Sequence, residues 1–300
     1  MKKIYVYDTA RNHTSQFTEQ FALGVTASRT NWVSTYLPIK HYLENGIPDD
    51  ANAVASLGVL RGTGLMFKEA HSKDIDWYHM DHAYFDPGYY NAGWLRITHN
   101  GHTMNSIKNC DNARYVNNFK DKVTLCEWRT KDRRGENILI CPPTHATQWF
   151  FDEYEWTDRV VNTLKSYLPE DQHWRIRIRT KPNEPVVDGL GNLVRMEQNS
   201  TAEVPITQDL DAAFCVISYN SMVALQASLL GIPVVVSSAN CCYPITKSLH
   251  DFSQDPYPDS YDEAPNRKAL LYWLAHCQYN REELGNGFAW RHLLETQGGG

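Results

Sequence analysis

The chain has 300 residues, of which 42% are hydrophobic, 21% charged and 12% aromatic. This composition excludes a long disordered chain, and the length suits two α/β domains of about 150 residues each. No window holds about 18 uncharged apolar residues, so we expect no transmembrane helix and no membrane insertion.

The N-terminus and the cysteines both point to the cytoplasm. Residues 1–8 turn acidic too early for a signal peptide, and they predict a first strand instead. The seven cysteines are scattered, without a C-x-x-C pair. An odd number without framework spacing fits a reducing compartment and disfavours a structural zinc site.

The net charge of −6 gives the molecule as a whole no attraction to nucleic acid. One segment differs, because residues 101–136 hold eight Lys or Arg and five Asp or Glu, a local charge of +3. Such a segment can grip a phosphate backbone. A solvated basic face explains it more simply, and the sequence favours that explanation.

Apolar runs and helical spacing alternate along the chain. In the first half they predict strands over 3–7, 53–60 and 76–80, and helices over 15–23 and 65–71. In the second half they predict strands over 137–141, 174–178, 212–217 and 232–236, and helices over 147–168, 220–230, 267–277 and 281–294. Apolar strands that alternate with helices imply parallel sheets covered on both faces. We therefore predict two Rossmann-like α/β domains, 1–135 and 136–300, and leave open that the C-terminal helix packs back on the first.

The clearest candidate site follows the strand predicted at 212–217. Ser218 ends the strand, and Asn220 or Ser221 is expected to cap the next helix. The first-turn N–H groups would then face the crevice at the carboxyl end of the strand, which suits an anionic phosphate. An ordinary N-cap explains the same residues equally well.

The strand predicted at 174–178 carries alternating arginines, and Arg179 and Lys181 follow at its carboxyl end. Basic side chains there would neutralise a diphosphate whose negative charge grows as a glycosidic bond breaks. A positively charged edge strand is the alternative. The loop after the strand at 137–141 adds Thr144 and His145 on the same side.

In the first half, Asp81 and His82 end the strand predicted at 76–80. Either could take the proton of an acceptor hydroxyl, with Asp81 the first candidate. A turn at the end of the strand, in which the Asp81 carboxylate accepts backbone N–H bonds, explains these residues almost as well. His79, Asp81 and His82 are also metal-ligand types. Neighbours on a strand point to opposite faces, however, so at most two converge and we expect no metal.

A glycine-containing turn, Arg-Gly-Thr-Gly at 61–64, closes the strand at 53–60. Its glycines permit close approach of the backbone to a ligand, and Arg61 could hold a phosphate. The expected acceptor-binding residues are Arg61, Thr63, Arg96, Lys122 and Arg129.

The stretch from 216 to 235 combines a strand, Asn-Ser, a helix and a Gly-Ile-Pro-Val strand. It resembles the donor domain of GT-B glycosyltransferases, especially of the capsule-polysaccharide type. The resemblance implies that Asn220 and Ser221 lie at a nucleotide diphosphate. It places Gln226 where many such enzymes bind ribose with a Glu. Arg-Thr-Lys-Pro at 179–182 is similar to the Arg-x-Lys-Pro strand end of the same enzymes.

Three segments of the first half, Leu-Arg-Gly-Thr-Gly, Asp-His-Ala-Tyr-Phe and Leu-Arg-Ile-Thr-His-Asn-Gly, resemble a bacteriophage-associated group. Enzymes of that kind transfer glucose or arabinose to hydroxymethylated pyrimidines of viral DNA. Together the resemblances imply a GT-B fold with two domains facing a cleft, and a UDP-sugar as co-substrate without a required metal cofactor.

We therefore expect a cytoplasmic glycosyltransferase, in the host cytoplasm if viral, that acts on a 5-hydroxymethylpyrimidine such as 5-hydroxymethylcytosine in double-stranded DNA. Such a base must leave the stack to react. The expected DNA contacts are Lys120, Lys122, Arg129, Lys131, Arg133 and Arg134. The alternatives are transfer to a capsule or lipopolysaccharide glycan, a nucleotide-sugar epimerase on the same fold, and a non-catalytic sugar- or DNA-binding protein.

Overall fold

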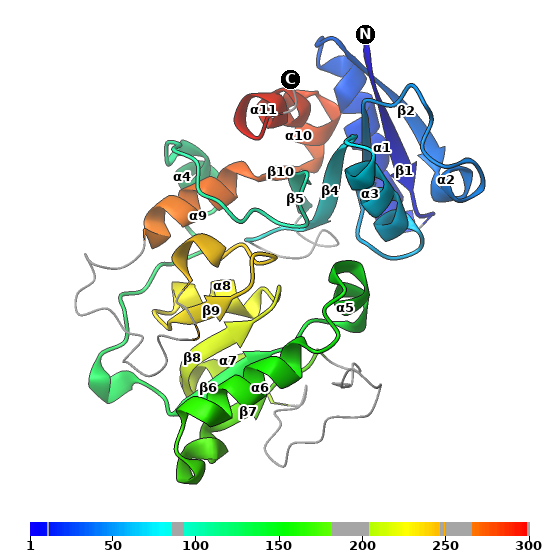
Figure 1. Cartoon of the computed structure of the whole chain (residues 1–300). Coiled ribbons are helices and arrows are strands. Elements are labelled where there is room, and N and C mark those ends of the chain that lie inside the picture. Colours follow the sequence, from blue (N-terminus) through cyan, green and yellow to red (C-terminus); the bar gives the residue numbers. More distant parts are fainter. Residues whose placement is uncertain (11, 86–92, 182–203, 247–248, 250–265, 299–300) are drawn as a thin grey trace. The chain divides into compact units, whose positions relative to one another are not determined.

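The computed structural model describes residues 1–10, 12–85, 93–181, 204–246, 249 and 266–298. The chain forms two compact units (Figure 1). Unit 1 contains Met1–Met104, Cys110–Lys122 and Tyr272–Gly300, and unit 2 contains Asn105–Asn109 and Val123–Leu271. Both units are α/β with parallel strands, which is the predicted fold class.

Unit 1 is built on a six-stranded sheet in the order β10-β5-β4-β3-β1-β2. The first four strands along the chain run parallel, whereas β5 and β10 form an antiparallel edge. The strands are β1 (Lys2–Asp8), β2 (Trp32–Pro38), β3 (Ala53–Leu57), β4 (Asp76–His82), β5 (Trp94–His99) and β10 (Gln278–Asn280). The three apolar runs of the first half therefore form strands as predicted.

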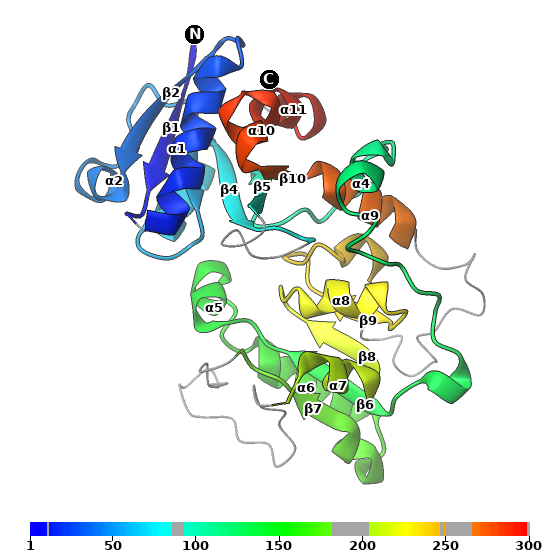
Figure 2. The ribbon, with the colours of Figure 1, turned by 180° about the vertical axis from the view of Figure 1, so that it is seen from behind.

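Helices cover both faces of this sheet, because its parallel strands are apolar on both sides. Figure 1 shows α3 (Thr63–Ser72) in front of the sheet, and Figure 2, seen from behind, shows α1 (Asn12–Ala27) in front of it. Alternation along β4 directs Tyr78 and Met80 into the core shared with α1. It directs His79 toward α3, where the rings of His79 and Phe67 lie 5.6 Å apart. The short α2 (Ile39–Asn45) follows β2.

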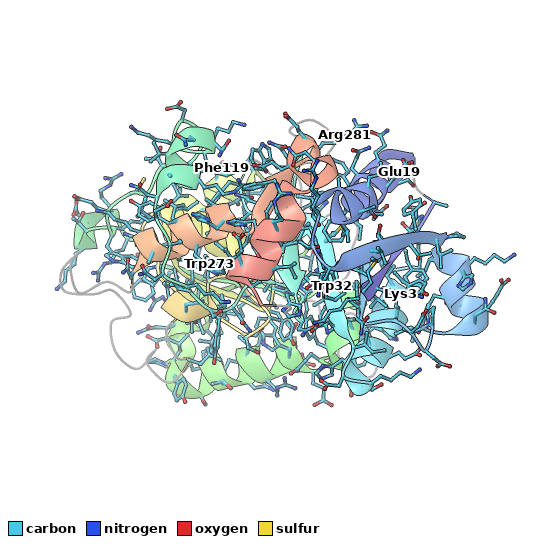
Figure 3. All side chains as sticks on the ribbon, turned by 90° about the horizontal axis from the view of Figure 1, so that it is seen from above. Lys3, Glu19, Trp32, Phe119, Trp273 and Arg281 are labelled. Atoms are coloured by element: carbon cyan, nitrogen blue, oxygen red, sulfur yellow. The ribbon has the colours of Figure 1, made fainter. Side chains whose placement is uncertain are left out.

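The C-terminal segment completes unit 1. It contains β10, α10 (Arg281–Gly285) and α11 (Phe288–Thr296), and it is reached through α9 (Arg267–His276). Trp290 is fully buried, with its ring 5.2 Å from that of Trp32 (labelled in Figure 3). A Cβ on Gly24 of α1 would lie 1.7 Å from the carbonyl oxygen of Leu284, so only glycine permits this approach of α1 and α10.

The boundary therefore differs from the predicted division at residue 135. The chain enters unit 2 at Val123 and returns at Tyr272. The physical reason for the return is the pairing of β10 with β5, which makes the last strand part of the first sheet. The helix predicted over 281–294 is likewise interrupted, because Gly287 adopts a φ of +82° between α10 and α11.

Residues 110–122 lie in the sequence between two segments of unit 2 but belong to unit 1, and they contain α4 (Ala113–Asn118). The Arg114 guanidinium donates to the Glu283 carboxylate and to the carbonyl oxygens of Ala275 and Gln278. Phe119, labelled in Figure 3, has its ring 4.7 Å from that of Trp94. These contacts fix residues 110–122 to the C-terminal segment and to β5.

Unit 2 holds a four-stranded parallel sheet in the order β7-β6-β8-β9. Its core contains apolar side chains of β6, β7, β8 and α6. The strands are β6 (Asn137–Cys141), β7 (Ile176–Ile178), β8 (Ala213–Ser218) and β9 (Val234–Val236). The helices are α5 (His145–Phe151), α6 (Trp156–Tyr167), α7 (Ile206–Asp211) and α8 (Val223–Leu229).

Three boundaries in unit 2 differ from the prediction. The helix expected over 147–168 is split into α5 and α6, because Asp152 adopts a left-handed φ of 58°. A 3₁₀ helix over Glu170–Arg175 occupies the start of the strand expected over 174–178. Helix α8 begins at Val223, three residues later than expected. Among all helices in the described residues, none is both long and apolar enough to cross a bilayer.

Candidate functional site

The strand order of unit 2 creates a natural binding position. The chain leaves β6 toward β7 on one side of the sheet and later places β8 on the other side. The loops after β6 and β8 therefore diverge at the carboxyl edge of the sheet. Open α/β sheets bind ligands at such a switch point, because two diverging loops leave room between them. The predicted donor residues Thr144, Asn220 and Ser221 lie on these two loops, and Ser218 is the last residue of β8.

A hydrogen bond joins the two loops. The Asn220 side-chain nitrogen donates to the Thr147 hydroxyl, 3.1 Å away. Thr147 is buried in the first turn of α5, and its backbone N–H donates to the Thr144 hydroxyl, 3.3 Å away. Thr144 is therefore the N-cap of α5. Thr147 was not among the predicted residues, because a Thr inside a predicted helix carries no sequence signal for a site.

Asn220 or Ser221 was expected to cap α8. The helix starts at Val223 with Met222 at the N-cap position, and the Asn220 amide contacts Thr147. The Ser221 hydroxyl accepts from the Val223 N–H at 3.3 Å. The buried Ser218 hydroxyl accepts from the Ser221 N–H at 3.0 Å. The Asn240 amide donates to the Ser221 carbonyl oxygen at 3.1 Å, which adds the loop after β9. The turn after β8 is thus fixed from three sides.

Arg179 follows β7, and its N–H donates to the Ile140 carbonyl oxygen of β6 at 2.8 Å. Its guanidinium pairs with Asp209 of α7, and the Arg179 side chain is 13% exposed. The structure therefore places Arg179 at the carboxyl edge, with the Asp209 carboxylate beside it. Lys181 and His145 are exposed, and Gln226 lies on the exposed side of α8.

In unit 1, Asp81 is held by its neighbours on the sheet. Asp81 Oδ2 lies 2.9 Å from Nη2 of Arg96, whose side chain is 6% exposed. Asp81 Oδ1 accepts from the His82 N–H at 2.8 Å. Burial is the largest single influence and raises the pKa of the Asp81 carboxyl. Interactions with Arg96, with the imidazoles of His79 and His102 and with the His82 N–H together more than offset it, so the pKa lies well below its ordinary value. Asp81 is therefore anionic at working pH and a weak base, whereas His82 is exposed beside it.

Two imidazoles lie next to this ion pair. The rings of His79 and His102 stack, with centroids 4.6 Å apart. His79 is fully buried, and burial lowers its pKa to about 4, so the ring is neutral at pH 7. His102, in the loop after β5, was missed by the sequence analysis, because that loop has no periodicity that assigns it to a face of the sheet.

Thr63, one of the predicted acceptor-binding residues, stabilises the loop after β3. The Thr63 hydroxyl is buried and donates to the carbonyl oxygens of Gly58 and Leu60, 2.8 and 2.7 Å away. Arg61 is exposed in the same loop, with a φ of 64°. Thr63 therefore shapes the turn from which Arg61 projects.

The parallel strands of unit 1 repeat the strand order of unit 2, so the loops after β1 and β3 diverge at a second switch point. Asp8 ends β1, and both of its carboxylate oxygens accept from the Ser15 hydroxyl at 2.9 Å. Asp8 was also missed, because a single acidic residue at the end of a strand is too common to indicate a site.

The basic segment at 101–136 does not belong to one unit. Lys122 is exposed in unit 1, whereas Arg129 lies in unit 2. The Arg129 side chain is 12% exposed and donates to the carbonyl oxygens of Leu210 and Asp211. Arg129 therefore ties its loop to α7, and Arg96 is occupied by Asp81.

No protein-family model matches the sequence, and no curated protein matches it. Solved structures that resemble the chain include the following three. Two are KpsC proteins of Thermosulfurimonas dismutans, each 11% identical with a TM-score of 0.46. The β-Kdo 2,4-transferase match covers 92% of this chain and 89% of that one, and the β-Kdo 2,7-transferase match covers 97% and 99%. The third, described as a UDP-N-acetylglucosamine 2-epimerase of Listeria monocytogenes, is 12% identical, covers 98% and 95%, and has a TM-score of 0.27.

Proposed function

We propose that the chain is a glycosyltransferase that moves a sugar from a nucleotide-activated donor, in the first instance a UDP-sugar, to a hydroxyl acceptor. The carrying observation is the hydrogen bond between Asn220 and Thr147 at the switch point of unit 2. It fixes two diverging loops that are rich in hydroxyl and amide groups, beside a strand that ends in Arg179 and Lys181.

Such an edge has the chemistry that a nucleotide diphosphate needs. Hydroxyl and amide groups of Thr144, Asn220 and Ser221 can donate to phosphate oxygens. Arg179 and Lys181 supply positive charge where the leaving diphosphate gains negative charge. Asp209 fixes the position of the Arg179 guanidinium, but its negative charge also competes with the phosphates for that guanidinium. In this proposal, transfer does not depend on a metal at the diphosphate.

For the acceptor proton, we propose His82 in place of Asp81. A general base works best when its pKa lies near the working pH, and imidazole is the side chain that ordinarily meets this condition. Asp81 is ionised but weakly basic, because Arg96 stabilises its negative charge. We assign Asp81 a positioning role, since its carboxylate accepts from the backbone N–H of His82 and so fixes the main chain from which the imidazole extends.

For the acceptor itself, we favour a glycan hydroxyl over a base in DNA. Two of the basic side chains expected to contact DNA or its base, Arg96 and Arg129, are largely buried and hydrogen-bonded within their own units. The local charge of residues 101–136 is also divided between the two units. Both facts remove support from the 5-hydroxymethylpyrimidine acceptor.

The test is a matrix of donors and acceptors. The purified full chain is incubated with a panel of nucleotide sugars and either capsule- or lipopolysaccharide-type oligosaccharides or duplex DNA with and without 5-hydroxymethylcytosine. Mass spectrometry follows the released nucleotide and the mass of the acceptor. Sugar on the glycan supports the proposal, and sugar on the modified base restores the DNA acceptor. Donor interconversion without any acceptor would identify an epimerase, and no reaction with any pair would overturn the transferase.

A further inference from the structure

A cluster of three metal-ligand side chains lies in unit 1, on the face of the sheet that α3 covers. One ring nitrogen each of His79 and His102 and a carboxylate oxygen of Asp81 all lie within 4.8 Å of one another. His79 and Asp81 are two residues apart on β4, so both point to this face. His102 comes from the loop after β5, and its carbonyl oxygen lies 2.9 Å from His79 Nδ1.

The state of His79 suggests a ligand. The contact with the His102 carbonyl oxygen requires a proton on Nδ1, which leaves the lone pair on Nε2. Nε2 is buried and has no hydrogen-bond partner among the described residues. An unsatisfied buried polar atom costs about 1–3 kcal/mol. An imidazole that donates from one nitrogen to a carbonyl and offers the other is also the usual arrangement of a metal ligand.

We propose that His79, Asp81 and His102 bind a divalent transition-metal cation, with Zn²⁺ as the first occupant to test. Two imidazole nitrogens and one carboxylate suit zinc and its neighbours in the first transition row, whereas Ca²⁺ and Mg²⁺ prefer oxygen ligands. Three protein ligands leave one position of a tetrahedral ion for water or for the hydroxyl of a bound ligand. This site lies in unit 1 and goes beyond the proposed donor site in unit 2.

Binding requires a small adjustment. Zn²⁺ lies ~2 Å from each ligand atom, so two ligand atoms of a tetrahedral ion are about 3.3 Å apart, and the three side chains must close by up to about 1.5 Å. The guanidinium of Arg96 competes, because it already holds Asp81 Oδ2 at 2.9 Å. Arg96 also donates to the His82 carbonyl oxygen at 3.3 Å and lies 5.3 Å from the Tyr84 ring, and neither of these contacts involves the ligand atoms. Removing the charge of Arg96 should therefore strengthen metal binding.

The experiment uses the full chain without a histidine tag, stripped with a chelator and desalted. Zn²⁺ is titrated against a chromophoric competitor, and the retained metal is measured by mass spectrometry of the elements. We expect about one tightly held Zn²⁺ per chain. His79→Gln and His102→Gln should each weaken its affinity at least tenfold, and Arg96→Gln should tighten it. The matched control is His71→Gln, which removes an exposed histidine of α3 and should change nothing.

The proposal is overturned if the stripped chain retains no Zn²⁺, or if it binds Zn²⁺ equally well with and without these ligands. Far-UV circular dichroism checks that each variant is folded. If His79→Gln does not fold, His102→Gln and Asp81→Asn decide the outcome, since both side chains are less buried. Metal binding is read without substrate, so its failure is distinct from a failure of the proposed transferase.

Discussion

Asn220 and Thr147 stand 73 positions apart in the sequence, and the amide of one donates to the hydroxyl of the other at 3.1 Å. The relationship fixes the width of the proposed donor site, because both loops are anchored locally. The Thr147 N–H donates to the Thr144 hydroxyl, and the N–H of Ser221, next to Asn220, donates to the Ser218 hydroxyl.

We predict that Asn220→Ala weakens the binding of UDP by about tenfold, since a hydrogen bond of this kind contributes about 1 kcal/mol and the loops lose their alignment. Isothermal titration calorimetry measures the dissociation constant. Asn162→Ala, on the exposed side of α6, is the matched control and should leave binding unchanged. Equal affinities in the two variants would place the nucleotide elsewhere.

Arg179→Gln should reduce the affinity for UDP by tenfold or more while the affinity for uridine stays unchanged. The reason is that the guanidinium would contact only the phosphates, through charge-assisted hydrogen bonds. Asp209→Asn should increase the affinity for UDP, because it removes the negative charge that competes with the phosphates for Arg179. Calorimetry at low and high salt separates these effects. A parallel loss for uridine would show a general distortion of the site.

His82→Ala is expected to lower kcat by about a hundredfold while donor binding stays the same, as for the loss of a general base. The rate of the wild type should rise with pH as an imidazole loses its proton, and the variant should lack this rise. Asp81→Asn should retain more activity than His82→Ala. If Asp81→Asn is the more damaged enzyme and keeps the imidazole titration, the carboxylate is the base and our assignment is reversed.

Acid should destabilise unit 1 through His79. Its pKa is about 4 in the folded chain, below the ordinary 6.5. The unfolded chain therefore binds a proton first as the pH falls. Stability is fully present above pH 6.5 and declines toward pH 4, by a limit of about 3 kcal/mol for this group. Thermal unfolding at several pH values should show a weaker decline in His79→Gln than in wild type or His71→Gln.

Gly24→Ala should destabilise the fold by about 1–3 kcal/mol, because the added methyl group meets the Leu284 carbonyl oxygen at 1.7 Å. Chemical denaturation measures the loss. Ala27→Gly, near the end of the same helix, changes helix propensity by a comparable single methyl group and should cost no more than about 1 kcal/mol. A variant Gly24→Ala as stable as wild type would show that α1 and α10 separate easily.

The sequence predicted the strands and helices that have a clear hydrophobic pattern. β6, β8 and β9 are uninterrupted apolar runs, so their positions were predicted to within two residues. β10 has three residues, and its place in the sheet depends on pairing with β5, so local pattern contained no sign of it. The division between the units was misplaced for the same reason.

The candidate site shows the same limit. Ser218, Asn220 and Ser221 were found because they interrupt an apolar strand before a helix. Thr147 and His102 were missed, because their importance arises from partners far along the chain. The role of Asp81 could not be predicted from the sequence either, since only the folded sheet places Arg96 against its carboxylate.

Unit 2 is inserted within the sequence of unit 1, and this has a consequence during synthesis. Every residue of unit 2 leaves the ribosome before β10, α10 and α11 exist. Until then the edge of β5 is unpaired, and Phe21 and Trp32 lack the Trp290 ring that covers them. The half of the molecule that is made first is therefore the last to complete its core. In the interval its open strand edge and bare aromatic face are the surfaces that a chaperone would bind, or through which nascent chains would aggregate.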